Sequence, residues 1–216
     1  MAKVYMYVVA RDFGFAPNPF HGVCTLATCK PKIRGPAKPG DWVVGMGGQQ
    51  LDATGRCVYF MKVTDKMTFN EYWNAPQFKG KRPVRNGSRK VMLGDNIYHR
   101  DDDNDPWTQE DSHHSKPDGS PEWWNVETDT GADSVLISTR FVYFGSSAPE
   151  IPKGILTEIG YENRRSHRTF YDWQCGALIA WMGSFPTSHW NLVLSDPFQF
   201  AQSGARYSRE RNAIVA

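Results

Sequence analysis

Residues that could do chemistry gather in one polar stretch near the middle of the chain. The stretch includes "GDNIYHRD" and "WTQEDSHHSKPDGS", and residues 95–115 place carboxylates, amides, hydroxyls and histidines within 21 positions. Histidine can act as a general acid, a general base or a metal ligand near neutral pH. We therefore treat His113 and His114 as candidate general bases, with Asp95 or Asp111 orienting the ring. Candidate ligand-binding residues in the same stretch are Asn96, His99, Gln109 and Ser112.

Two other interpretations of this stretch remain open. Adjacent side chains of an extended segment point in opposite directions, so His113 and His114 can share one site only if the chain turns there. The spacing of histidines and carboxylates matches no standard zinc or iron pattern, and we expect no metal site. The serines and histidines could instead hydrogen-bond the backbone of their own loop.

A proline-rich loop near the start of the chain is the second candidate. It contains "APNPFHGVCTLATCKPKIR" at residues 16–34, in which flat rings alternate with amide and hydroxyl groups. A nucleobase pocket needs stacking faces and groups that hydrogen-bond the base edge. Proline lowers the entropy lost when the wall of such a pocket is ordered. The expected ligand-binding residues here are Arg11, Asp12, Phe15, Asn18, Phe20, Thr25, Lys30 and Arg34.

Charges are segregated along the chain, although the formal net charge is only +2. Residues 79–90, "KGKRPVRNGSRK", carry six basic groups, and residues 101–111 carry six acidic ones. The first run, with "NRRSHR" at residues 163–168, could hold phosphates or could form solvated surface. We expect residues 11–28 and 95–115 to meet in one cleft, with basic groups at its rim.

The four cysteines follow neither a disulfide framework nor a zinc pattern. Cys24 and Cys29 are five residues apart, whereas Cys57 and Cys175 are isolated. We expect reduced, mostly buried thiols, because free cysteine is among the most buried residue types. No apolar run approaches the length of a membrane span, and the start "MAKVYMYVV" lacks the layout of a signal peptide. We therefore expect a cytoplasmic protein without a membrane partner.

Hydrophobic patterns predict the elements that position these residues. β-branched and aromatic runs predict strands over residues 4–10, 42–45 and 56–64, which we expect in one curved, largely antiparallel sheet. Thr68 and Glu71 have the spacing of a capping box and predict a short helix, "FNEYW".

Later in the chain, residues 134–145 predict one long strand or a tight strand pair. Apolar residues at helical spacing predict a helix over residues 170–182, packed by Trp173 and Trp181 and ended by Gly183. Between residues 78 and 133 the chain is nearly all polar, glycine or proline. Such a span is usually functional or disordered, and its tryptophans argue against disorder. We expect one α+β domain over residues 1–216, with a functional, loop-rich insertion at about 78–133.

The order of strand, loop, "GDWVVG", strand "VYFMKVT" and helix "FNEYW" is similar to that of PUA-like domains, including the EVE and YTH domains. The resemblance covers about residues 1–75. It implies a curved sheet or barrel with flanking helices, and an aromatic pocket that accepts a flipped, often modified base.

A more extensive resemblance covers most of the chain. It rests on "YVVARDFGFAPNPFHGVCTLATCKPKIR", "GDWVVG", "GDNIYHR", "QEDSHHS" and "VLISTRFVYFG", which resemble the second of the nucleotide modification-associated domain families. That family occurs in bacteria and phages near genes for altered DNA bases. The resemblance implies a role with nucleotides or nucleic acid.

Three functions fit these observations. The first is a module that binds a modified nucleobase, nucleotide or nucleic acid. The second is an enzyme that modifies or hydrolyses the same target with a His113 or His114 base. The third is a scaffold subunit of a modification complex. The chain lacks a P-loop, a Rossmann fingerprint and the paired motifs of zinc deaminases, so no cofactor is favoured. A homo-oligomer or association with DNA-modifying enzymes is a further expectation.

Overall fold

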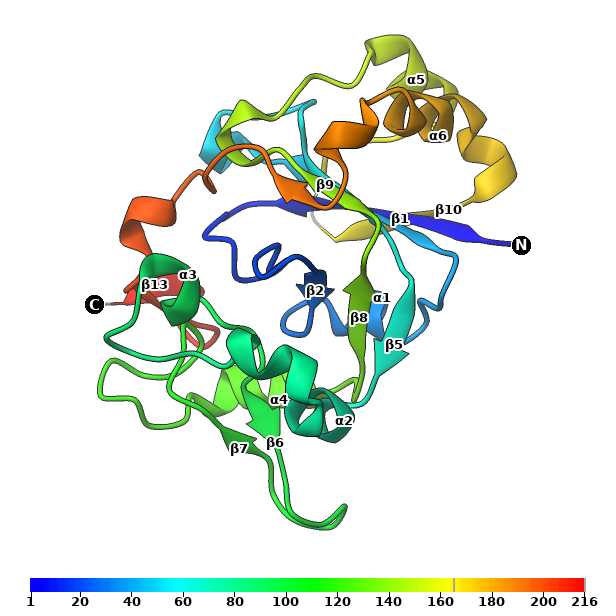
Figure 1. The fold of residues 1–216 in the computed structure, drawn as a ribbon. Helices are drawn as coiled ribbons and strands as arrows, with labels where there is room; N and C mark the ends of the chain where they lie inside the picture. Colours follow the sequence, from blue (N-terminus) through cyan, green and yellow to red (C-terminus); the bar gives the residue numbers. More distant parts are fainter. Residues whose placement is uncertain (165, 216) are drawn as a thin grey trace.

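A mixed six-stranded sheet forms the upper half of the molecule in Figure 1. The computed structural model describes residues 1–164 and 166–215. The strand order is β10 (His167–Tyr171), β1 (Lys3–Val9), β3 (Trp42–Gly47), β4 (Cys57–Lys62), β9 (Phe141–Tyr143) and β11 (Leu192–Val193). The three strands expected in one sheet are therefore neighbours.

The pairing of β1 with β3 corrects the expectation of a largely antiparallel sheet. These two strands are parallel, with Val4 opposite Trp42, and β9 and β11 are parallel as well. Parallel neighbours need a long crossover, and residues 10–41 provide it. This crossover contains the proline-rich loop of residues 16–34. Within the described residues the strands close no barrel, and the fold is α+β.

A smaller antiparallel sheet lies below the first and consists of β2 (Cys24–Leu26), β8 (Val135–Ser138) and β5 (Asp65–Met67). Residues 134–145, expected as one long strand or a strand pair, form two strands that join the two sheets. β8 belongs to the small sheet, and β9 (Phe141–Tyr143) belongs to the large one. Two hairpins complete the β structure, β6 (Tyr98–His99) with β7 (Thr108–Gln109), and β12 (Arg206–Ser208) with β13 (Ala213–Val215).

Short helices surround the two sheets. α5 (Lys153–Glu158) and α6 (Gly176–Gly183) lie together on the upper side of the large sheet in Figure 1. The lower half contains α1 (Pro31–Arg34), α2 (Phe69–Asn74), α3 (Arg89–Met92) and α4 (Trp123–Thr130). α2 confirms the predicted capping box, because the Thr68 side chain accepts from the Glu71 N–H and the Glu71 carboxylate accepts from the Thr68 N–H.

The helix expected over residues 170–182 is correct only in its second half. Residues 167–171 form β10, which pairs with the exposed edge of β1, and α6 begins at Gly176. Trp173 is 69% exposed and stacks on Tyr171 at the surface. Trp181 does face the core, where its ring contacts Phe60. The unpaired backbone of an edge strand offers hydrogen bonds that a local helical pattern does not reveal.

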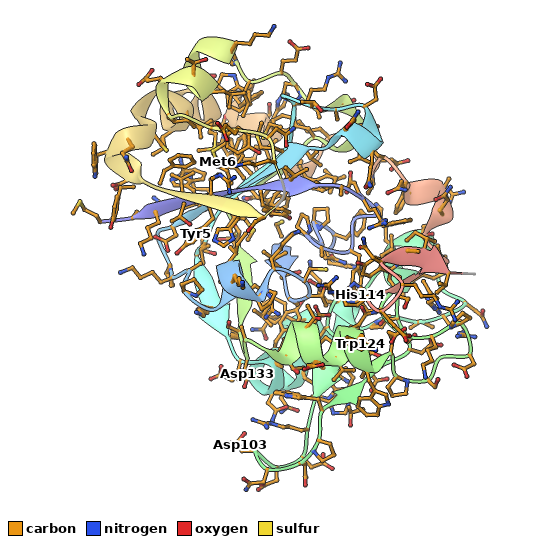
Figure 2. The ribbon with its side chains drawn as sticks, turned by 180° about the vertical axis from the view of Figure 1, so that it is seen from behind. Tyr5, Met6, Asp103, His114, Trp124 and Asp133 are labelled. Atoms are coloured by element: carbon orange, nitrogen blue, oxygen red, sulfur yellow. The ribbon has the colours of Figure 1, made fainter. Side chains whose placement is uncertain are left out.

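Two hydrophobic cores result from this arrangement. Alternation along β1 sends Met6 to the side of α5 and α6 and Tyr5 to the opposite side, as Figure 2 shows. The first core covers the large sheet. The second joins the aromatic side chains of the crossover, such as Phe15, to Phe69 of α2 and to the middle segment (residues 78–133), which contributes Tyr98. The middle segment is thus packed, although much of it is irregular. No helix in the described part of the chain has the length and apolar character needed to span a bilayer.

Substitution of Gly45 by alanine tests the packing of the large sheet. A Cβ atom there would lie 2.3 Å from the ring of Tyr59, which faces Gly45 from β4. We expect the free energy of unfolding to fall by about 1–3 kcal/mol, the usual cost of overpacking. Gly154→Ala is the matched control, since a Cβ at Gly154 meets no atom within 4 Å. Equal urea midpoints for the two variants would contradict the packing.

Candidate functional site

A pocket opens where β1 ends, between the two cores. It encloses about 140 Å³, and its walls come from segments far apart in the sequence. β1 and the crossover contribute Tyr7, Arg11, Phe13, Phe15, Cys29 and Lys30, the middle segment contributes His113 and His114, and the C-terminal hairpin contributes Tyr207. β1 continues directly into the crossover. The pairing of β1 with β3 therefore fixes the position of the pocket wall that β1 and the crossover form.

Cys29, His114 and Asp129 form a hydrogen-bonded series in the wall of the pocket. The Cys29 Sγ atom lies 3.6 Å from Nε2 of His114, and Nδ1 of the same ring lies 2.7 Å from Oδ2 of Asp129. The second carboxylate oxygen of Asp129 accepts the backbone N–H of Cys29 at 2.6 Å. A thiol, an imidazole and a carboxylate in this order are the arrangement of an activated nucleophile, its base and the group that orients the base.

The β6–β7 hairpin supports the carboxylate from behind. The Tyr98 hydroxyl donates to Asp129 Oδ2 at 2.9 Å, and the Gln109 amide donates to the Tyr98 hydroxyl at 2.9 Å and to the His114 carbonyl at 3.2 Å. Tyr98 and Gln109 are opposite each other in the hairpin. Because Asp129 lies in the last turn of α4, these contacts fix both the helix and the histidine relative to the hairpin.

A buried arginine, Arg34, binds the backbone carbonyls of both Cys29 and Asp129. The Arg34 guanidinium donates to the carbonyl oxygen of Cys29 at 2.7 Å and also to that of Asp129. It further donates to the carbonyls of Ala132 and Ser134. Arg34 is fully buried, so these hydrogen bonds compensate for its lost hydration. Arg34 therefore holds the loop that carries Cys29 against the segment that follows α4.

The charges of His114 and Asp129 depend on each other. Burial would lower the pKa of His114, but the Asp129 carboxylate and Cys29 raise it to about 10. Burial would likewise raise the pKa of Asp129, but the charge of His114 and its hydrogen bond hold it below the ordinary value. His114 is thus an imidazolium at neutral pH, and its Nε2–H points at the sulfur of Cys29.

His113 has the opposite character, although it is the adjacent residue. Burial and the charge of His114 lower the pKa of His113 to about 3, so the ring is neutral at pH 7. Its Nδ1 lies 2.6 Å from the Ala205 carbonyl, which can only accept, and this nitrogen must therefore carry the proton. A turn at residues 112–115 brings both rings to one pocket, with centroids 5.9 Å apart. From the sequence, His113 and His114 could share one site only if the chain turned between them. The structure has this turn.

A family model described as nucleotide modification associated domain 2 matches residues 1–204. The chain belongs to the nucleotide modification associated domain 2 family. The resemblance drawn from the sequence motifs is thus confirmed, and with it a role in nucleotide or DNA modification. No curated protein and no solved structure matches the chain. In this family member, Cys29, His114 and Asp129 all lie within the matched residues, whereas Tyr207 lies beyond them.

Several residues expected to bind a ligand belong instead to a buried polar network in this family member. The Lys81 ammonium donates to Asn18 and Thr25, and the Thr25 hydroxyl and Tyr72 donate to Asp95. This network links the crossover to the middle segment without reaching the pocket wall. The aspartate that contacts His114 is Asp129, which the sequence did not single out.

The remaining expected residues also have structural partners outside the pocket. Asp12 accepts from Tyr143, and Phe20 packs on Phe200. Asn96 donates to the Tyr72 carbonyl, and His99 stacks on Trp73 and contacts Glu110. Asp111 pairs with Arg85 and Arg206, and the Ser112 hydroxyl accepts from the His114 N–H. Of the expected ligand-binding residues, Arg11, Phe15 and Lys30 do line the pocket.

The charged runs lie away from the pocket walls. Asp103 marks the acidic run at the tip of the β6–β7 hairpin, far from His114 in Figure 2. The described basic residues of 79–90 and 163–168 are absent from the pocket lining, and Arg165 lies outside the described residues. A phosphate-binding role for these runs therefore stays a prediction.

The same three side chains could also be considered as metal ligands, since one ligand atom from each of Cys29, His114 and Asp129 lies within 4.8 Å of the others. The hydrogen bonds disfavour this use. His114 directs different nitrogens at the thiol and the carboxylate, and both Asp129 oxygens already accept hydrogen bonds. A metal would have to displace these contacts and would obtain three of the four ligands of a structural zinc site. We expect elemental analysis to find no stoichiometric zinc.

The neutral His113 predicts acid destabilisation. Its folded pKa of about 3 is below the ordinary value of 6.5. The unfolded chain therefore binds one more proton between these limits, and stability falls as pH falls through this window. The expected loss is up to about 1.4 kcal/mol per pH unit. Glutamine cannot take up a proton in this range. In the His113→Gln variant, the free energy of unfolding, measured with urea, should therefore fall less steeply between pH 6.5 and 4. An unchanged slope would contradict the neutral state.

Proposed function

We propose that this chain is an enzyme of nucleotide modification in which Cys29 is the nucleophile. The observation that carries the proposal is the hydrogen-bonded series Cys29–His114–Asp129, which ends at an aromatic pocket. A buried histidine paired with a buried carboxylate needs no thiol beside it for stability. The placement of Cys29 against Nε2 of that ring, the nitrogen that does not contact Asp129, supports a catalytic use of the sulfur.

The proposed reaction is covalent catalysis at an electrophilic carbon of the nucleotide. In this proposal His114 Nε2 holds the proton of the Cys29 sulfur, the sulfur attacks this carbon, and the S–C bond forms as the bond to the leaving group breaks. The leaving group takes the bonding electron pair and the proton of His114 Nε2. Water then attacks the same carbon, and His114 takes its proton. The C–O bond forms, the S–C bond breaks and the thiolate returns, so the net reaction is hydrolysis.

The other pocket residues supply binding and orientation in this proposal. Asp129 keeps His114 charged and directs its Nε2 at the sulfur. Phe15 and Tyr207 flank the histidine ring, with centroids 4.7 Å and 5.6 Å from it. Such faces can stack on a base, a contact worth roughly 1–3 kcal/mol. The middle segment supplies His114, its supporting hairpin and α4, which supports assigning a functional role to the insertion at residues 78–133.

Binding without reaction is the second candidate function. The aromatic walls around Phe13, Phe15 and Tyr207 favour it, because they suit recognition of a modified base whether or not chemistry follows. A pure scaffold gains nothing from such a pocket. Whether the target is a free nucleotide or nucleic acid, and whether the chain associates with itself or with DNA-modifying enzymes in the cytoplasm, stay predictions.

Replacement of Cys29 separates the two candidates. The substrates to test are deoxynucleotides and the mononucleotides released from DNA that carries modified bases, followed by mass spectrometry. We expect Cys29→Ala to lower turnover at least about 1000-fold while nucleotide affinity stays within a few-fold of the original. Cys24→Ala is the control, because Cys24 is a buried thiol in β2 that does not line the pocket. Turnover that survives in Cys29→Ala would refute the nucleophile, and ligands recovered unchanged would favour binding alone.

Asp129→Asn tests the orienting carboxylate. The amide retains an acceptor for the Cys29 N–H but loses the charge that holds the proton on His114. We expect kcat to fall by roughly 100- to 10,000-fold, with a smaller change in KM. Circular dichroism and urea unfolding should establish that the variant is folded. A kcat equal to that of the original protein would exclude a role for the Asp129 charge.

A further inference from the structure

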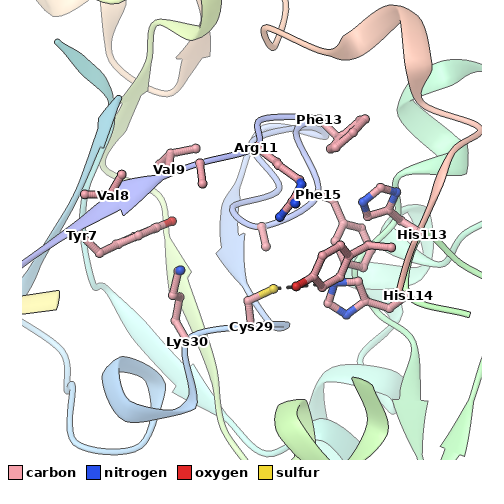
Figure 3. A pocket seen from close by; sticks show the side chains of 13 residues that line it. Tyr7, Val8, Val9, Arg11, Phe13, Phe15, Cys29, Lys30, His113 and His114 are labelled. Carbon is pink, nitrogen blue, oxygen red and sulfur yellow. Dashed lines mark hydrogen bonds between the residues drawn. The ribbon is translucent and has the colours of Figure 1, made fainter. Parts of the chain in front are cut away.

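Lys30 places an unpaired ammonium group at the pocket, next to the sulfur of Cys29. Its Nζ lies 4.7 Å from the centre of the Tyr7 ring, and both side chains line the pocket. Figure 3 shows Lys30 and Tyr7 on one side of Cys29 and the two histidines on the other. Among the described residues, Nζ of Lys30 has neither a carboxylate nor a hydrogen-bond acceptor within bonding distance.

Arg11 brings a second cation to the same pocket. Its guanidinium donates to the Asn212 carbonyl at 2.9 Å and lies over the ring of Tyr207. It makes no ion pair with any carboxylate in the described part of the chain. Asp129, the carboxylate behind the pocket histidine, is already engaged with His114. Even with the Cys29 sulfur counted as an anion, Lys30, Arg11 and His114 give this site more positive charge than Cys29 and Asp129 neutralise.

A cation that is partly buried without a partner has a cost. Burial lowers the pKa of Lys30, the nearby Cys29 raises it and the charge of Arg209 lowers it further. A lysine on an open surface keeps most of its hydration, so its ammonium group needs no anionic partner. Lys30 is half-buried against an aromatic ring, where an ammonium favours a negative partner. The pocket that Lys30 lines gives such a partner a place to bind.

We propose that the substrate carries an anionic oxygen group, the phosphate in a nucleotide, which binds between Lys30 and Arg11 while the reacting carbon lies at Cys29. This inference rests on the proposed nucleophile and deepens it by excluding neutral bases and nucleosides as good substrates. A phosphate and a carboxylate share the chemistry that Lys30 and Arg11 recognise, and the experiment distinguishes them.

Alkylation of Cys29 tests the proposal without knowledge of the substrate. Iodoacetate is anionic and iodoacetamide is neutral, and both transfer a two-carbon group to the sulfur with loss of iodide. Peptide mass spectrometry measures the alkylation rate of Cys29 with each reagent. The ratio of the iodoacetate rate to the iodoacetamide rate is then divided by the same ratio for N-acetylcysteine, which corrects for the intrinsic reactivity of the reagents. We expect the pocket to favour iodoacetate by about tenfold at low ionic strength, since two cations lie near the sulfur, and salt should reduce this preference.

Variants assign the effect to the pocket cations. Lys30→Gln should remove most of the preference, and Lys30→Arg should retain it. Lys153→Gln, at an exposed position at the start of α5, is the control and should change nothing. In a second arm, deoxynucleoside monophosphates or inorganic phosphate should protect Cys29 from iodoacetamide more strongly than acetate or nucleosides do.

The outcomes separate the two proposals. Equal normalised rates for the two reagents, or equal protection by nucleosides and nucleotides, would overturn the anionic substrate and leave the nucleophile standing. If acetate protects Cys29 as strongly as phosphate does, the site recognises a carboxylate as well as it recognises a phosphate. That result would overturn the proposal that the nucleotide phosphate is the recognised group. A folded protein whose Cys29 reacts with neither reagent would contradict the nucleophile itself, and the anionic substrate with it.

Discussion

The ion pair between His114 and Asp129 is the constraint on which the site depends. A buried carboxylate is stable only if its charge is matched and its oxygens are hydrogen-bonded. Asp129 meets this condition through His114, the Cys29 N–H and the Tyr98 hydroxyl. Each partner comes from a different segment, so satisfying one charge brings the crossover, the β6–β7 hairpin and α4 to a single point. The sulfur of Cys29 lies beside the charged ring as a result.

The neighbouring histidine shows how strongly position decides chemistry. His113 and His114 share a turn, yet one contacts a carbonyl oxygen and the other a carboxylate. The first is therefore neutral and the second charged at pH 7. A charged and a neutral ring in one pocket provide a proton donor and an uncharged polar wall.

Local sequence signals predicted local structure well. The capping box of Thr68 and Glu71, the strand β1 and the end of α6 at Gly183 all follow from neighbouring residues. The pairing of β1 with β3 and with β10 depends on long-range hydrogen bonds, so the parallel crossover and the shortened helix could not be predicted. The histidines of the site were predicted from their chemistry. Asp129 and Cys29 were not, because neither an aspartate in a polar helix nor a cysteine five residues from another has a distinguishing local pattern.

The protonation state of His114 tests this description most directly. Nitrogen-15 NMR of the histidine rings, between pH 6 and 9, reports whether each nitrogen carries a proton. The structure predicts that His114 stays an imidazolium across this range in the original protein and loses its proton at lower pH in Asp129→Asn, while His113 remains neutral throughout. A His114 ring that titrates near its ordinary value of 6.5 in the original protein would contradict the ion pair and the catalytic arrangement built on it.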